Sequence, residues 1–258
     1  ITAAVGVDAG IINPDENLGY VGLSWQKDAS WGDYHVTTLT DYGETVNLVN
    51  AMTYSDNIYF ARETLKIGAD TMEEKLKSFG FEEELPFDLT MQASTFDDDG
   101  KIDSEIQLAD TGYGQGQVLV NPLHLLSMYS MFVNDGNMIQ PVLKYEENAA
   151  AKIWKEQAVS AQTAQTVKQS LLSVIENPSG TGASAKIDGV TMLGTGTAEI
   201  KESQDDTTGV ERGWFICETT EDMPNQIAVV GMVEDVKTKG SSSYVTQKVR
   251  NIAVSYLQ

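Results

Sequence analysis

The chain has 258 residues, of which 41% are hydrophobic, enough for one large domain with a substantial core. Its formal net charge of -21 and its lack of a basic stripe exclude ordinary nucleic-acid binding, because such a chain repels phosphate. The single cysteine, Cys217, excludes a disulfide scaffold, and its apolar neighbours predict a buried strand residue rather than a nucleophile. No run approaches the ~20 apolar residues of a membrane span, so any targeting or anchoring segment is expected outside the chain.

The first part of the chain predicts short helices around an irregular excursion. A helix over 1–9 stops at Gly10, and because the chain opens inside this pattern we expect a fragment boundary there. Residues 20–40, rich in glycine, tryptophan and tyrosine, predict loops with short strands. A short helix over 46–52 then leads to Ser55.

The stretch 54–68 is the most informative local pattern. It opens with Ser55, Asp56 and Asn57, whose side-chain oxygens suit the start of a helix because they can accept the unpaired amides of its first turn. The helix has an apolar stripe and ends at Gly68. Polar groups are therefore expected at a rigid helix start.

Further helices are predicted in the middle of the chain. One runs over 70–79, with Asp70 and Glu73 resembling a capping box, and another over 121–132 opens with asparagine and proline. Between them, three glycines in 108–117 suggest that the backbone approaches another group closely.

The last third predicts a sheet between two helices. A helix over 162–175 is broken by the segment 178–182. Three strands follow, over 190–201, 213–218 and 227–233. The final helix, 241–257, is predicted to turn five side chains inward: Tyr244, Val245, Val249, Ile252 and Tyr256. Early helices, late strands and a closing helix predict an α+β fold with an antiparallel sheet covered by helices.

Five motifs follow one another along the chain. They lie at 1–4, 25–32, 54–57, 108–116 and 195–199. In this order they resemble the transpeptidase domain of the low-affinity class B penicillin-binding proteins, along essentially the whole length. The resemblance implies a serine β-lactamase-like fold forming one domain over 1–258, truncated at its N-terminus before the nucleophile segment.

The resemblance also implies a reaction and catalytic roles. Enzymes of this family acylate a serine with the D-Ala-D-Ala end of a peptidoglycan stem peptide, or with a β-lactam that mimics it. By this resemblance Ser55 relays protons and Asn57 holds the amide of the substrate. No cofactor and no metal are implied.

Five further residues are implied to bind substrate: Tyr54, Gln115, Thr195, Gly196 and Thr197. Thr195 would contact the substrate carboxylate, and the backbone N–H of Thr197 would donate to the oxyanion. The strand that carries them would pair with the extended peptide by adding its edge to it.

The chain departs from the family in two places. The Ser-x-x-Lys motif with the nucleophile and its base is expected immediately before Ile1, and Gly194 stands where the family has lysine. The chain as written is therefore expected not to acylate, whether the glycine was introduced or is a natural defect. Two alternatives stay open, a catalytically dead binding module and a β-lactam sensor domain.

The implied setting is the outer face of the cytoplasmic membrane, in an extracytoplasmic domain of a cell-wall synthase. The expected partners are peptidoglycan stem peptides and β-lactams, with other cell-wall synthesis proteins left open. Nucleic acid is not an expected partner, and membrane contact is expected only through a segment outside this chain.

Three other patterns give weaker predictions. Ser24 and Lys27 have Ser-x-x-Lys spacing, but the glycines around them predict a surface loop, not a helix. Residues 95–106 resemble a calcium loop without its final glutamate, so a solvated acidic loop is expected. His35 and His124 lack a supporting motif, and each is predicted to be a partly buried ring with a satisfied hydrogen bond.

Overall fold

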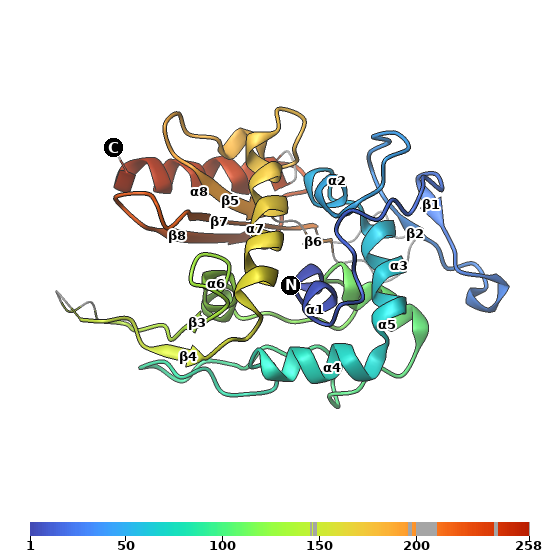
Figure 1. Cartoon of the computed structure of the whole chain (residues 1–258), viewed down its shortest axis with the longest axis horizontal. Coiled ribbons are helices and arrows are strands. Elements are labelled where there is room, and N and C mark those ends of the chain that lie inside the picture. The colour runs from blue at the N-terminus through green and yellow to red at the C-terminus, as the bar shows by residue number, and fades with distance from the viewer. Residues whose placement is uncertain (145, 147–148, 196–197, 200–210, 240–241, 258) are drawn as a thin grey trace. The chain divides into compact units, whose positions relative to one another are not determined.

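The computed structural model describes residues 1–258 except 145, 147–148, 196–197, 200–210, 240–241 and 258. The described residues form two compact units. Figure 1 shows the helices and strands with their labels. One unit consists of 1–14 with 60–167, and the other of 15–59 with 168–258. Among the helices described, none combines the length and apolar character needed to cross a membrane.

The first unit is mainly helical. Its elements are α1 (Thr2–Asp8), α4 (Ala69–Ser78), α5 (Glu105–Gly112), α6 (Pro122–Ser130), β3 (Met138–Ile139) and β4 (Ile153–Lys155). α6 starts as predicted, because the Asn121 side chain accepts from the Leu123 amide and Pro122 occupies the first turn. β3 and β4 pair antiparallel, and α6 packs on β3.

The predicted capping box at the start of α4 is wrong. The residue before the helix is Gly68, with φ 80°, and it makes no side-chain cap. Glu73 Oε1 instead accepts a hydrogen bond from the Ile102 backbone amide at 2.8 Å. Asp70 lies inside the first turn, where its charge favours the positive end of the helix dipole.

The second unit contains the main sheet. Its elements are β1 (Ser24–Trp25), η1 (Ala29–Trp31), β2 (Val36–Thr37), α2 (Leu48–Thr53), η2 (Ala183–Ala185), β5 (Met192–Thr195), β6 (Ala198–Glu199), β7 (Glu211–Thr219), β8 (Ala228–Val233) and α8 (Ser242–Leu257). β5, β6 and β8 all pair antiparallel with β7, and α8 packs on β7 and β8 (Figure 1). Two helices, α3 (Asn57–Ile67) and α7 (Ala161–Glu176), continue from one unit into the other. The mixed helix and antiparallel-sheet prediction is confirmed.

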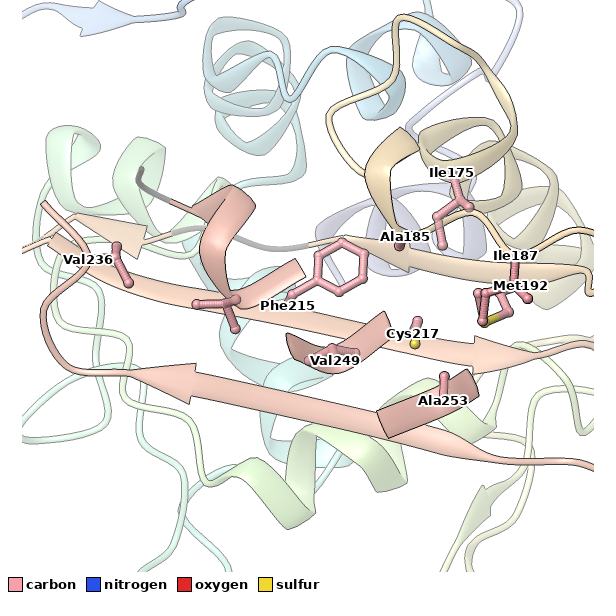
Figure 2. Packing of buried hydrophobic residues seen from close by; sticks show 10 residues of the cluster. Ile175, Ala185, Ile187, Met192, Phe215, Cys217, Val236, Val249 and Ala253 are labelled. Atoms are coloured by element: carbon pink, nitrogen blue, oxygen red, sulfur yellow. The ribbon is translucent and has the colours of Figure 1, made fainter. Parts of the chain in front are cut away.

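A hydrophobic core joins this sheet to α8 and to the end of α7 (Figure 2). It includes Ile175 of α7, Phe215 and Cys217 of β7, and Val245 and Val249 of α8.

Burial raises the pKa of the Cys217 thiol to about 12. Cys217 is therefore the buried strand residue that the sequence predicted.

The inward face of α8 differs from the prediction at its end. Val245 and Val249 are buried, but Ile252 and Tyr256 are 46% and 73% exposed. Ala253 is buried instead. The buried row follows steps of four residues, which keep one line along a helix, and this line passes through Ala253 rather than Ile252.

Candidate functional site

A tight turn joins α2 to α3 and carries the first candidate residues. The Asp56 amide donates to the Ala51 carbonyl at 2.8 Å, and the Ser55 amide donates to the Met52 carbonyl at 3.2 Å. This pair of bonds ends α2 in a Schellman motif, whose penultimate residue adopts a left-handed conformation. Ser55 is that residue, with φ 56°, a backbone conformation in which glycine is favoured. The candidate serine is therefore held at a strained position with its side chain exposed.

Asp56 caps α3. Its Oδ1 accepts from the amides of Ile58 at 2.9 Å and Tyr59 at 3.2 Å. Tyr42 donates to Oδ2 of the same carboxylate at 2.6 Å, and the Tyr42 ring stacks on Tyr54 at 4.7 Å between centroids. The predicted polar helix start is confirmed, although one aspartate makes the cap and the other two polar side chains bond elsewhere.

Those two side chains reach different segments of the same unit. Asn57 donates through Nδ2 to the Thr37 carbonyl at 3.1 Å. Ser55 Oγ lies 2.9 Å from Thr181 Oγ1 in a hydrogen bond in which either hydroxyl can be the donor. Both Ser55 and Thr181 are exposed, so a bound molecule can reach this pair.

The second candidate segment is the end of β5. Thr195 is the last residue of this strand and is half-buried, opposite Ile216 of β7. Gly194 is buried and pairs with Cys217. Gly196 and Thr197 lie outside the described residues.

Gly194 has no room for a side chain. A Cβ on it would lie 2.4 Å from the Ile216 carbonyl oxygen and 3.1 Å from Ile175 Cδ1. The carbonyl belongs to the neighbouring strand, so it cannot move away as the end of a flexible side chain could. At this position, where the sequence lacks the expected lysine, the two strands approach as closely as glycine allows.

The end of α7 links the two candidate segments within the second unit. Ile175 contacts the position of Gly194, and Val174 borders Gly182, the residue after Thr181. Thr181 in turn bonds to Ser55. The turn between α2 and α3 that carries Ser55, called here the serine turn, and the end of β5 therefore both lie next to α7.

Gln115 belongs to the first unit and follows α5, a helix that the sequence did not predict. Its backbone amide donates to the Asp110 carbonyl at 2.9 Å. The close approach expected of the nearby glycines occurs at Gly112, where a Cβ would lie 2.2 Å from Thr64 Oγ1. Gln115 and the serine turn lie in different units, so its role stays a prediction.

Ser24 is exposed, as predicted, but it lies on a short strand rather than in a loop. It is an exposed residue of the two-residue strand β1, paired with Thr37, and is not at a helix start. Ser24 and Lys27 therefore do not lie one turn apart on the same face of a helix, as a catalytic Ser-x-x-Lys pair would.

The acidic loop and the two histidines are held by hydrogen bonds within the fold. Asp97 accepts from the Asp99 amide through Oδ1 and from Gln107 through Oδ2. No cluster of three or more potential ligand side chains occurs in the part of the chain that the structure describes.

Both histidine rings make a hydrogen bond, as predicted, but His124 is fully rather than partly buried. His124 is buried, and its Nε2 donates to the Phe79 carbonyl at 2.9 Å while Nδ1 lies 2.7 Å from Ser94 Oγ. Burial lowers the pKa of His124 below its usual value. His35 is half-buried, with Nδ1 2.9 Å from the Asp33 carbonyl.

Sequence reasoning missed Thr181 and Tyr42. The sequence predicts Thr181 only as part of a helix-breaking segment, and the local signal that distinguishes it is the glycine on each side. Tyr42 has no local signal, because its partners Tyr54 and Asp56 lie more than ten residues further along the chain.

The strained conformation of Ser55 gives a first prediction. Replacing Ser55 by glycine should give a protein about 1 kcal/mol more stable than the alanine variant, because glycine adopts positive φ without the Cβ penalty. Both variants lose the hydroxyl bond to Thr181, so this bond cancels in the comparison. Urea unfolding of the two variants measures the difference, and equal stabilities would contradict the strain.

Comparison with known proteins adds information about the whole chain. The model of a family described as the penicillin binding protein transpeptidase domain matches residues 1–253. Penicillin-binding protein 3 of Bacillus subtilis is 41% identical over 251 residues, which are 97% of this chain and 37% of that protein. Stage V sporulation protein D of the same organism is 28% identical over 144 residues, 52% of this chain and 22% of that protein. The chain thus spans well under half the length of these relatives.

A solved structure supports the fold. PBPA from Mycobacterium tuberculosis superposes with a TM-score of 0.79 and 20% identity, covering 100% of this chain and 59% of that one.

Proposed function

Because the chain belongs to the penicillin-binding protein transpeptidase domain family, we propose that its parent protein is a serine D,D-transpeptidase. It cross-links peptidoglycan stem peptides through an acyl-enzyme formed at a terminal D-Ala-D-Ala, and β-lactams bind the same site. The observation that carries the proposal is the α2–α3 turn, which presents the exposed hydroxyl of Ser55 beside a capped helix start.

The roles of the site residues are part of this proposal. Ser55 relays protons and Asn57 holds the substrate amide. Five residues bind the rest of the substrate: Tyr54, Gln115, Thr195, Gly196 and Thr197. The Asn57 amide is anchored to a backbone carbonyl 3.1 Å away, so it keeps a fixed orientation before substrate arrives.

Acyl transfer needs a nucleophile, a group that takes its proton, and donors for the developing oxyanion. In residues 1–258 the Ser-x-x-Lys spacing occurs at Ser24 and Lys27, and Ser24 lies on the two-residue strand β1 rather than at a helix start. We therefore propose that another part of the protein supplies the nucleophile, and that this chain alone does not acylate. Residues 1–258 belong to one transpeptidase domain on the outer face of the cytoplasmic membrane.

One observation favours a second function, a non-acylating module that binds the same peptides. The family lysine supplies a cation for the substrate carboxylate, and the strand pairing at Gly194 leaves no space for any side chain. A module of this kind keeps the fold and affinity for D-Ala-D-Ala without forming an acyl-enzyme.

Labelling with a fluorescent penicillin tests the proposal. The samples are residues 1–258 and a form of the protein that includes whatever sequence precedes Ile1 in its gene. We expect the longer form to be labelled covalently and residues 1–258 to stay unlabelled. In the longer form, Ser55→Ala should slow labelling by about 10²–10⁴-fold, the range for loss of a proton-transfer group.

Ser24→Ala is the matched control, because this serine is exposed but lies on strand β1. It should leave labelling unchanged. Label on residues 1–258 at Ser24 would contradict the site assignment. If the longer form binds a D-Ala-D-Ala peptide without becoming labelled, the non-acylating module is the correct function.

A further inference from the structure

The turn after α7 presents Thr181 to Ser55 in a fixed position. Three backbone bonds hold it. The Gly180 amide donates to the Asn177 carbonyl at 2.8 Å, the Gly182 amide to the Val174 carbonyl at 3.1 Å, and the Thr181 amide to the Thr53 carbonyl at 3.0 Å. The first two bonds close the end of α7. The third ties the turn to the end of α2, only two residues before Ser55.

The glycines on each side of Thr181 are required by close packing. A Cβ on Gly180 would lie 2.3 Å from the Val174 carbonyl oxygen. One on Gly182 would lie 3.1 Å from Val174 Cγ1 and 3.3 Å from Phe215 Cε2. The turn is therefore pressed against both α7 and β7, and Thr181 has little freedom to move away from its partner.

A second hydroxyl contact supports the same junction. Thr53 Oγ1 lies 2.6 Å from Ser173 Oγ of α7. The ends of α2 and α7 are thus joined by a side-chain contact and a backbone bond next to the Ser55–Thr181 pair. The position of the threonine hydroxyl relative to Ser55 follows from this rigid surrounding structure.

We propose that Thr181 is a positioning residue that fixes the orientation of the Ser55 hydroxyl. When Thr181 donates, Ser55 accepts, and the Ser55 hydrogen stays free to be donated to a bound substrate. Without this bond an exposed serine side chain exchanges among staggered rotamers, because nothing else recorded in the described structure restrains its oxygen. The importance of this orientation for acyl transfer rests on the proposed function, whereas the orientation itself does not.

The first test measures the Ser55 side chain directly. In residues 1–258, three-bond NMR couplings of the Ser55 β-protons should indicate one dominant rotamer in the wild type. They should also do so in Thr181→Ser, which keeps the hydroxyl. In Thr181→Val, which keeps the shape and loses the hydroxyl, the couplings should be averaged. Thr238→Val is the matched control, because Thr238 is an exposed threonine in another turn of the same unit.

Urea unfolding of the same variants separates positioning from folding. Thr181→Val should unfold at nearly the wild-type urea concentration, because the backbone bonds of the turn remain. An unchanged single rotamer in Thr181→Val would overturn the proposal. Averaging in the Thr238→Val control would overturn it as well, since the effect would then not be specific to Thr181.

The second test measures acylation by fluorescent penicillin in the form of the protein with its upstream sequence. Thr181→Val should lower the acylation rate constant about 10–100-fold, and it should change the penicillin concentration for half-maximal rate by a smaller factor. Thr181→Ser, which keeps the hydroxyl, should have most of the wild-type rate constant. Equal rates in wild type and Thr181→Val would overturn the functional part of the proposal. If the wild type is not acylated at all, the proposed transpeptidase function fails, and the rotamer measurement still decides whether Thr181 orients Ser55.

Discussion

Replacing Gly194 by lysine should destabilise the domain rather than restore a missing catalytic group. A Cβ at this position would lie 2.4 Å from the Ile216 carbonyl oxygen, closer than such atoms approach in folded proteins. Relieving the contact requires β5 and β7 to separate at their Gly194–Cys217 pair, in the middle of a buried sheet. Overpacking of a core typically costs about 1–3 kcal/mol, and we expect Gly194→Ala to lose about 2 kcal/mol and Gly194→Lys at least as much.

Urea unfolding of the variants checks this prediction. Ala228→Lys is the matched control, because it places lysine in the same sheet at an exposed position of β8 and should change stability by less than about 0.5 kcal/mol. Ile175→Val, which shortens the other neighbour, should not rescue Gly194→Ala, since the backbone carbonyl remains. Wild-type stability in Gly194→Lys would show that the two strands separate easily at this pair, which would contradict the prediction.

The predicted destabilisation by Gly194→Lys bears on why position 194 has glycine where the family has lysine. From the sequence, Gly194 is a missing lysine in an otherwise matching motif. In the structure, β7 and the end of α7 are packed against the glycine and leave no space for a Cβ. A single Gly194→Lys substitution is therefore expected to disturb the strand pairing rather than to add a cation at this position.

Much of the fold could be predicted because its signals are local. Asn121 and Pro122 indicated the start of α6, and the valines of α8 indicated its buried row. α5 was missed because it is short and ends in Asp, Thr and Gly, which favour helices weakly. The two outward residues of α8 were assigned inward because aromatic and β-branched side chains at nearly the right spacing resemble a core face.

The candidate site was predictable only in its local parts. Ser55, Asp56 and Asn57 form a recognisable helix start, and the cap is made as such residues make it. The bond between Ser55 and Thr181 joins residues 126 positions apart, and no periodic pattern connects two exposed turn residues. The crowding at Gly194 depends on strand register, which a motif does not specify.

Glu218 should make the stability of the domain depend on pH in an unusual direction. This glutamate lies on β7, is 8% exposed, and its Oε2 has no hydrogen-bond partner among the residues that the structure describes. Burial, together with the nearby charge of Glu221, raises the pKa of Glu218 to about 8, although Lys168 opposes the shift. Lys168 lowers the pKa of Glu218 only a little, because both of its hydrogen bonds go to the Glu221 carboxylate.

The direction of the effect follows from proton binding. Between the ordinary pKa of a glutamate and about 8, the folded state binds more protons at this site than the unfolded state, so the free energy of unfolding falls as pH rises. His124 has a lowered pKa and acts in the opposite direction as pH falls. Comparing wild type with Glu218→Gln cancels the contribution of His124, because the variant retains this residue.

We expect the stability of Glu218→Gln relative to wild type to increase by about 3 kcal/mol between pH 5 and pH 8. Urea unfolding at several pH values measures this difference. Glu221→Gln should reduce the pH dependence, because it removes a repelling charge and frees Lys168 to pair with Glu218. A difference between wild type and Glu218→Gln that is the same at pH 5 and pH 8 would mean that Glu218 is already ionised in the folded domain at pH 5, as a glutamate with an ordinary pKa would be.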